Sequence, residues 1–261
     1  MVVLKSFIIL AVGMYSSSVS AECSFRNDDA IKKKPVGGED YNLRPDPHYS
    51  WSNVRGVTTV RYIFDKSVED DQLTKKAFLD VMRELEARSC LKFVPTKSKS
   101  QKYLFIFAGN DCMFNDVTGG VKYDSGLQTQ TLEMSHRLCN RNLQQTKTSY
   151  YKVIRHEFLH VFGLMHTQTR WDRNQYVNVN TKNLVDSKEA RYQYEICKDC
   201  DTLDAPYECN SIMHYKTNTY AINPEKPVMT SINKSCIIKP SNYLTNEDWK
   251  LLNKAAKCPK I

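Results

Sequence analysis

Eleven consecutive residues carry most of the information in this sequence: His156-Glu157-Phe158-Leu159-His160-Val161-Phe162-Gly163-Leu164-Met165-His166. Residues four apart lie on the same face of an α-helix, so the imidazoles of His156 and His160 can reach one metal ion. Glu157 flanks that face and can reach a water molecule on the metal. Zinc lowers the pKa of such a water towards about 7, and a nearby carboxylate can take its proton. The stretch therefore predicts a hydrolytic zinc site.

A third ligand has to come from outside the helix, because the helix cannot supply it in line. Gly163 follows His160 by three residues, and glycine tolerates the positive φ that ends a helix and turns the chain back. His166 would then meet the same zinc ion. The alternative is two structural histidines on an amphipathic helix. Requiring both Gly163 and His166 makes a chance match roughly a thousandfold rarer, which disfavours that alternative.

The pattern His156-Glu157-x-x-His160-x-x-Gly163-x-x-His166 resembles the metzincin signature, and its surroundings resemble the astacin family. The segment Thr167-Gln168-Thr169-Arg170-Trp171-Asp172-Arg173 is close to that family's extended motif. Ser211-Ile212-Met213-His214-Tyr215 is similar to its Met-turn. The resemblance implies one catalytic zinc ion, an apolar floor at Met213, and Tyr215 as a mobile ligand that swings away to hydrogen-bond the oxyanion.

The resemblance runs from about Trp51 to Cys258 and implies an α+β fold with two lobes around a cleft. The N-terminal lobe would hold a twisted, mostly parallel sheet and two long helices, and the C-terminal lobe would be loop-rich and disulfide-bonded. Periodicity predicts helices at about 68–88, 149–164 and 245–257, and strands at about 57–64, 91–94, 103–107 and 127–132. Ser67 and Thr245 are the expected N-caps. The strand at 103–107 would lie near the edge that pairs with an extended substrate.

The N-terminus predicts secretion. Residues 1–21 combine a lysine, a short apolar run and a small residue at the end, which is the layout of a cleaved signal peptide. The apolar run is far shorter than the ~20 residues that a bilayer needs, so we expect no membrane span. Residues 22–47 are polar and irregular and are interpreted as a pro-segment, followed by a catalytic domain at 48–261.

Two features depart from the astacin pattern. The family normally has glutamate after the third histidine, where it helps to anchor the new N-terminus, and here that residue is Thr167. The pro-segment lacks the family's motif ending in Gly-Asp. Asp40, beside Glu39, would occupy the zinc in a latent form, but an acidic linker is an equal alternative. Cys23 is a second candidate latency ligand, because thiolate binds zinc well, and a disulfide with another cysteine of the chain or with a second chain is an equal alternative.

The chain has nine cysteines, which suits disulfide formation outside the cell. The astacin resemblance implies two pairs, Cys90–Cys258 and Cys112–Cys139. Four further cysteines allow three connectivities that the sequence leaves open, and their positions are Cys197, Cys200, Cys209 and Cys236. The C-x-x-C pair among them is interpreted as structural in preference to a redox or zinc motif. Asn233 begins a glycosylation sequon.

Composition excludes other classes of function. The net charge is +8, but the only dense basic run is Lys32-Lys33-Lys34, so we expect no nucleic-acid partner. The predicted activity is zinc-dependent hydrolysis of internal bonds in extended protein or peptide substrates, after processing by an activating protease. A catalytically silent binding or matrix protein is the alternative from another class, yet no ligand or base is missing. The oligomeric state and the substrate are left open.

Overall fold

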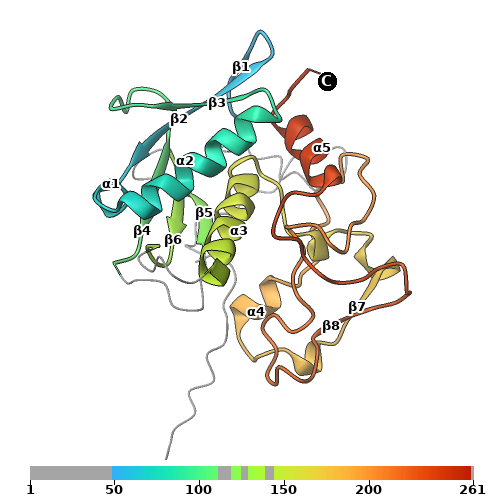
Figure 1. Cartoon of the computed structure of the whole chain (residues 1–261). Coiled ribbons are helices and arrows are strands. Elements are labelled where there is room, and N and C mark those ends of the chain that lie inside the picture. The colour runs from blue at the N-terminus through green and yellow to red at the C-terminus, as the bar shows by residue number, and fades with distance from the viewer. Residues whose placement is uncertain (1–48, 111–118, 125–128, 139–143, 260–261) are drawn as a thin grey trace, which may run out of the picture.

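The structure is a computed structural model that describes residues 49–110, 119–124, 129–138 and 144–259. The predicted signal peptide, the pro-segment and the candidate latency ligands Cys23 and Asp40 lie outside the described residues. The same holds for the predicted pair Cys112–Cys139. In Figure 1 the strands and long helices of the N-terminal half form one lobe, and the later, loop-rich part of the chain forms the other.

A mixed sheet forms the N-terminal lobe. Strand β2 pairs in parallel with β3 and with β4, and β4 pairs in parallel with β6. The short strand β1 and the edge strand β5 are antiparallel to their neighbours. The mostly parallel sheet predicted from the resemblance is therefore confirmed. The strands are β1 (Asn53–Val54), β2 (Val57–Phe64), β3 (Leu91–Pro95), β4 (Leu104–Ala108), β5 (Gly119–Asp124) and β6 (Thr129–Met134).

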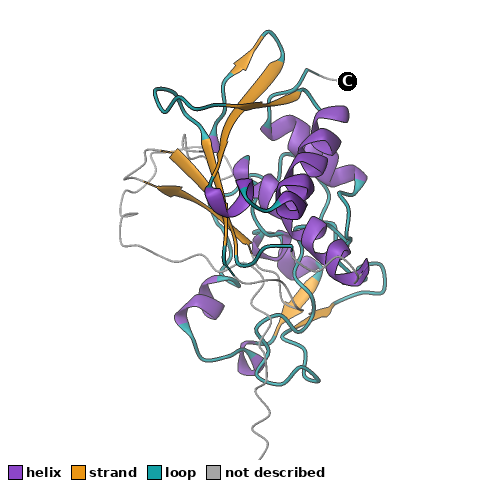
Figure 2. Ribbon diagram, turned by 60° about the vertical axis from the view of Figure 1, so that its left-hand side comes forward, coloured by secondary structure: helices purple, strands orange, loops and turns teal. Residues whose placement is uncertain are grey.

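Two long helices, α2 (Gln72–Ala87) and α3 (Gln144–Val161), cover one face of this sheet. They cross in front of the strands in Figure 1, and the turned view in Figure 2 shows the long helices on one side of the sheet. Phe78 of α2 meets Phe158 of α3 edge to face, with ring centroids 6.4 Å apart. Both side chains are fully buried, so the face of α3 opposite the zinc ligands is held in the core.

The single helix predicted at about 68–88 is wrong in its first turns. The structure has a short helix α1 (Lys66–Glu69) followed by α2, and each begins at an aspartate. The carboxylate of Asp71 accepts the backbone N–H groups of Leu73 and Thr74, which starts a new helix. Ser67 is not a cap, because its hydroxyl accepts the backbone N–H of Ala108 and ties α1 to β4.

The strand predicted at 103–107 also has a different place from the one expected. It corresponds to β4, which lies inside the sheet between β2 and β6. The edge strand is β5, which the sequence analysis did not predict. The strand begins with two glycines, which are not typical of strands. The alternation of inward and outward side chains, with Val121 pointing into the core, is therefore too short to be recognised in the sequence.

The C-terminal lobe has little regular structure and a core of its own. Its elements are β7 (Val177–Val179), α4 (Lys188–Tyr192), β8 (Met229–Ser231) and three short 3-10 turns. Tyrosines fill much of the interior, including Tyr194, Tyr215 and Tyr220. Disulfides join Cys197 to Cys200 and Cys209 to Cys236, which resolves the connectivity that the sequence left open.

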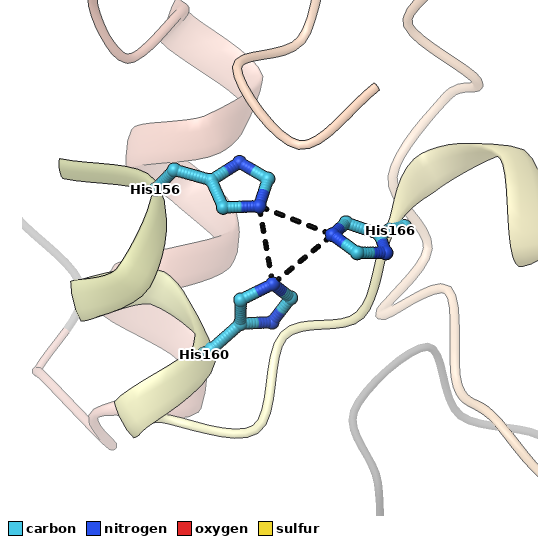
Figure 3. A group of neighbouring side chains, drawn as sticks. All are labelled: His156, His160 and His166. Carbon is cyan, nitrogen blue, oxygen red and sulfur yellow. Dashed lines mark hydrogen bonds between the residues drawn. The ribbon is translucent and has the colours of Figure 1, made fainter. Parts of the chain in front are cut away.

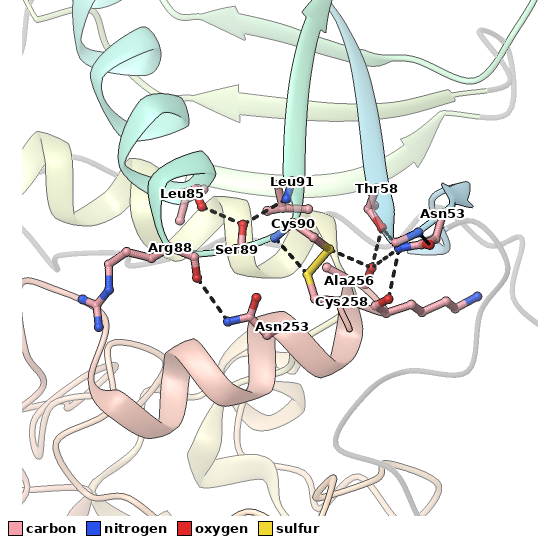
Figure 4. Close-up of a disulfide and its surroundings, with 12 residues drawn as sticks. Asn53, Thr58, Leu85, Arg88, Ser89, Cys90, Leu91, Asn253, Ala256 and Cys258 are labelled. Carbon is pink, nitrogen blue, oxygen red and sulfur yellow. Dashed lines mark hydrogen bonds between the residues drawn. A yellow bond between two sulfur atoms is a disulfide. The ribbon is translucent and has the colours of Figure 1, made fainter. Parts of the chain in front are cut away.

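Helix α5 (Asn246–Ala255) ties the end of the chain to the N-terminal lobe. Thr245 caps it in a capping box with Asp248, and the sequence predicted this cap. Figure 4 shows the disulfide between Cys90 and Cys258 at its C-terminal end, with Thr58 donating to the carbonyl of Ala256. The bridge spans 168 residues of sequence, for which chain entropy suggests about 5 kcal/mol of stabilisation. No helix in the described ranges is both long and apolar enough to cross a membrane.

Candidate metal centre and catalytic site

The C-terminal end of α3 sets the direction of the first two histidines. Gly163 has φ of 81°, and its N–H donates to the carbonyl of His160 while the N–H of Leu164 donates to that of Leu159. These two bonds form a Schellman motif with glycine at the left-handed position. The helix therefore stops at Val161, three residues before the predicted end, and the chain turns back towards its own last turns.

The turn brings the three histidines together. The Nε2 atoms of His156 and His160 are 3.1 Å apart, and the Nε2 of His166 lies 3.1 Å from the first and 3.2 Å from the second. In Figure 3 two of the rings project from adjacent turns of α3 and the third faces them from the returning segment. All three offer one nitrogen to a common point.

The other ring nitrogens of the first two histidines are held by backbone carbonyls. The Nδ1 of His156 lies 2.8 Å from the carbonyl oxygen of Ile212, and that of His160 lies 2.6 Å from the carbonyl oxygen of Leu164. A carbonyl can only accept, so each Nδ1 carries the proton and each Nε2 presents its lone pair. Ile212 is held in turn by Asp248 of α5, whose carboxylate accepts the Ile212 N–H at 3.0 Å.

Burial keeps these imidazoles uncharged. It lowers the pKa of His156 to about 4 and lowers the pKa values of His160 and His166 well below the usual range. Repulsion between the neighbouring rings lowers the last two pKa values further. At neutral pH all three side chains are therefore neutral, which is the form that binds a metal ion.

The site fits zinc. Zn–N bonds of 2.0–2.1 Å in a tetrahedral arrangement place ligand nitrogens about 3.3 Å apart, close to the spacing of the three Nε2 atoms. Three neutral imidazoles with fixed tautomers leave a fourth position for water or substrate, as in catalytic zinc sites. The donor set is the one the sequence predicted.

Glu157 lies between the two helical ligands and is fully buried. The edge strand β5 begins directly against it. An ideal Cβ built on Gly119 would lie 2.6 Å from Cγ of Glu157 and 2.9 Å from its Cδ and Oε1. Only a residue without a side chain allows β5 to approach the carboxylate this closely. Gly119 therefore fixes the gap between the sheet edge and the candidate base.

We expect the substitution Gly119→Ala to displace the Glu157 side chain or to push β5 away. Misplacing a catalytic group by about 1 Å costs on the order of 100-fold in rate, so kcat on a peptide substrate should fall about 10- to 100-fold. The zinc content should not change, because the three atoms nearest to the added methyl group all belong to Glu157 and none belongs to a ligand.

Gly120→Ala is the matched control, since residue 120 faces the opposite side of the strand. Stopped-time peptide assays and metal analysis of both variants measure the effect. An unchanged kcat for Gly119→Ala would mean that the position of Glu157 does not depend on β5.

The predicted Met-turn is joined to the histidine segments through its main chain. Met213 is buried, and its carbonyl oxygen accepts the backbone N–H of Thr167 at 3.0 Å. Because this bond uses only the main chain of Thr167, it does not depend on which side chain stands at position 167. His214 is buried too, accepting from the Tyr207 hydroxyl and donating to the Tyr215 carbonyl, as a structural residue would.

Tyr215 is buried against the third histidine, with 4.5 Å between its ring centroid and that of His166. Its hydroxyl donates to Oε1 of Gln193 at 2.8 Å. Sequence reasoning missed Gln193, Asp248 and Gly119. The glycine pair at 119–120 was a weak local signal, whereas nothing near residues 193 or 248 distinguished them.

Fold and site together define a zinc metalloendopeptidase. A family model described as Astacin, a family of peptidases, matches residues 46–257, and the chain belongs to this family. The earlier resemblance to astacins is confirmed.

Relatives of known class agree with this assignment. The chain is 26% identical to the low choriolytic enzyme of Oryzias latipes over 78% of its own length and 67% of that protein. It is 25% identical to meprin A subunit beta of Rattus norvegicus and to zinc metalloproteinase nas-14 of Caenorhabditis elegans. The chain spans 26% of the first of these two proteins and 42% of the second. The structure of high choriolytic enzyme 1, a hatching enzyme zinc-protease of Oryzias latipes, superposes with a TM-score of 0.64 at 21% identity, covering 82% of this chain and 96% of that one.

Proposed function

We propose that this chain is a secreted endopeptidase that uses one zinc ion to cleave internal bonds of extended polypeptides. The observation that carries the proposal is the convergence of three neutral imidazoles beside the buried carboxylate of Glu157. When bound, zinc polarises a carbonyl and lowers the pKa of water at that point.

In the proposed reaction Glu157 takes a proton from the attacking water and later delivers it to the leaving nitrogen of the substrate. The Tyr215 hydroxyl leaves Gln193 and donates a hydrogen bond to the tetrahedral oxyanion. Burial of Glu157 and Tyr215 excludes bulk water, which strengthens both interactions.

Strand β5 supports the choice of an extended substrate. Among the described residues β5 pairs with β6 alone, so its outer edge can receive a peptide as an added strand. This edge starts at Gly119, beside the proposed base. A substrate lying along it would present an internal bond to the histidines, which favours an endopeptidase.

Secretion and activation are further parts of the proposal. They rest on residues 1–21 as a signal peptide and 22–47 as a pro-segment, with Asp40 or Cys23 as latency ligand and a separate protease as activator. The disulfides of the described residues suit an oxidising compartment. Asn233 is exposed and is a proposed glycosylation site. Proteins of a chorion are one proposed class of substrate, because two similar enzymes are named choriolytic.

The test uses the full chain, expressed by secretion and processed, with an internally quenched peptide as substrate. We expect a zinc chelator to abolish cleavage and one equivalent of zinc to restore it. Mass spectrometry should find cuts inside the peptide and none limited to its ends. A processed protein that holds zinc and cleaves no peptide would support the binding-protein alternative and overturn the proposal.

A further inference from the structure

We propose that a groove in the C-terminal lobe, lined by the buried cation Arg173, binds an acidic segment of the polypeptide substrate. The inference rests on the proposed function, because it names a class of substrate for the same enzyme. The groove has a volume of about 650 Å³, and its walls come from the segments 173–181 and 230–232. It therefore lies beside strands β7 and β8, which Figure 1 shows in the C-terminal lobe.

Arg173 is nearly buried, and its guanidinium is held by the main chain. The residue is 8% exposed, and its Nη1 donates to the carbonyl of Gln168 at 2.9 Å and to that of Tyr194. Its Nε donates to Oδ1 of Asn174, a neighbouring residue of the groove wall, at 3.4 Å. A guanidinium in a protein always carries its charge, so the groove contains a fixed positive charge.

One nitrogen of this guanidinium is available to a ligand. Within the described part of the chain, Nη2 of Arg173 forms no hydrogen bond. It does not belong to the buried polar atoms that lack a partner, so solvent reaches it. Because Arg173 lines the groove, the approach to Nη2 is through the groove. Hydrogen bonds between a guanidinium and a carboxylate are among the strong ones, so this nitrogen favours a carboxylate acceptor.

No acidic side chain of the groove competes for Arg173. None of the described residues that line the groove is an aspartate or a glutamate. The adjacent Asp172 already accepts two bonds from Arg170, at 2.9 and 2.8 Å. Two exposed lysines, Lys182 and Lys234, follow the two wall segments closely in the chain. Charge complementarity therefore selects a negatively charged ligand.

The size of the groove favours a peptide segment over a single anion. A volume of about 650 Å³ lies in the range of about 300–1,000 Å³ that is typical of sites for drug-sized ligands. Asn178 and Thr230 lie opposite each other in the β7–β8 pair, and both are exposed. Their polar side chains can bond a peptide main chain, while Ile232, 53% exposed, offers an apolar contact. These contacts suit a short peptide whose acidic side chain points at Arg173.

A substrate bound at the histidines can reach the groove. Arg173 follows His166 by seven residues, so their Cα atoms are at most about 25 Å apart. An extended peptide of about eight residues covers that distance. The acidic side chain of the substrate should therefore lie within about eight residues of the cut bond.

The binding test uses the full, processed chain and a labelled glutamate-rich peptide, with fluorescence anisotropy as the measurement. Every protein carries Glu157→Gln, so that the peptide is not cut. Asn178→Asp places a carboxylate in the groove and should weaken binding about tenfold, which is the typical effect of losing a hydrogen bond between charged groups. Asn178→Ala removes the same amide without adding charge and should stay within about threefold.

Asn246→Asp is the matched control, because it adds the same charge at an exposed position of α5 that does not line the groove. Its affinity for the peptide should not change. Equal affinities with and without Asn178→Asp would overturn the proposal. Binding of a sulfated oligosaccharide but not of the peptide would overturn the assignment of the ligand to a polypeptide.

A cleavage assay on the protein with Glu157 intact tests the link to the substrate. Two peptides of equal length carry glutamate or glutamine within about eight residues of the cut bond. The glutamate peptide should have a KM about tenfold lower with a similar kcat, and Asn178→Asp should remove this difference. Equal KM values for the two peptides at every spacing would contradict the proposal. If the protein cleaves nothing, the anisotropy measurements still test the groove, so this failure is distinct from failure of the proposed function.

Discussion

Replacing Glu157 with glutamine should nearly abolish peptide cleavage while leaving the metal in place. Glutamine has the shape of glutamate but cannot take a proton from water, so the substitution removes general base catalysis and little else. This contribution is typically about 100- to 10,000-fold, and kcat should fall by that factor with KM within about twofold. Stopped-time assays give kcat and KM, and metal analysis of the same samples shows whether zinc is retained.

Glu133→Gln is the matched control for this variant. Glu133 is an exposed carboxylate on β6, and its loss should leave kcat unchanged. If Glu157→Gln retained more than about a tenth of the wild-type kcat, a role as general base would be excluded, since base catalysis supplies at least about 100-fold.

The substitution His166→Ala should also nearly abolish peptide cleavage, because it weakens zinc binding. With His166→Ala only two nitrogens remain, and both lie on one helix. Partners of zinc ligands contribute about 10- to 100-fold to metal affinity, so a ligand itself should contribute at least about 100-fold. Competition with a chromophoric chelator measures this loss, and peptide cleavage at low zinc concentration should fall with it.

The control for the His166 variant is His136→Ala, which removes a histidine that does not belong to the three-histidine group. Its zinc affinity should equal that of the wild type. Wild-type zinc affinity in the His166→Ala protein would mean that the metal is held by other residues, and the proposed donor set would be wrong.

Much of the fold follows from local signals. The periodicity of apolar residues located α2, α3 and α5, and Thr245 caps α5 as the sequence predicted. The errors arose where local signals compete. Asp71 offers a carboxylate to two backbone N–H groups, so the chain starts a second helix where periodicity alone suggests one.

In the site, too, some features follow from local sequence and others do not. The spacing of His156, His160, Gly163 and His166 needs only helix geometry and one left-handed glycine, and all four lie within eleven residues. The hydrogen bonds that hold the ligands and Tyr215 in place join residues far apart in the sequence. Asp248 reaches Ile212 across 36 residues of sequence, and Tyr215 reaches Gln193 across 22. No periodicity connects such pairs, so they could not be predicted.

The sequence by itself predicted the candidate metal ligands, the candidate base and the class of enzyme. The ligands and the base depend on positions within two turns of one helix and its end, and the class depends on the resemblance of short motifs to a known family. Only the tertiary structure decided which strand forms the edge, that Gly119 lies against Glu157, and which residues orient the ligands and Tyr215. The physical reason is that these contacts arise when the sheet, α4 and α5 pack around α3. Packing is decided by the whole core, and no short stretch of sequence encodes it.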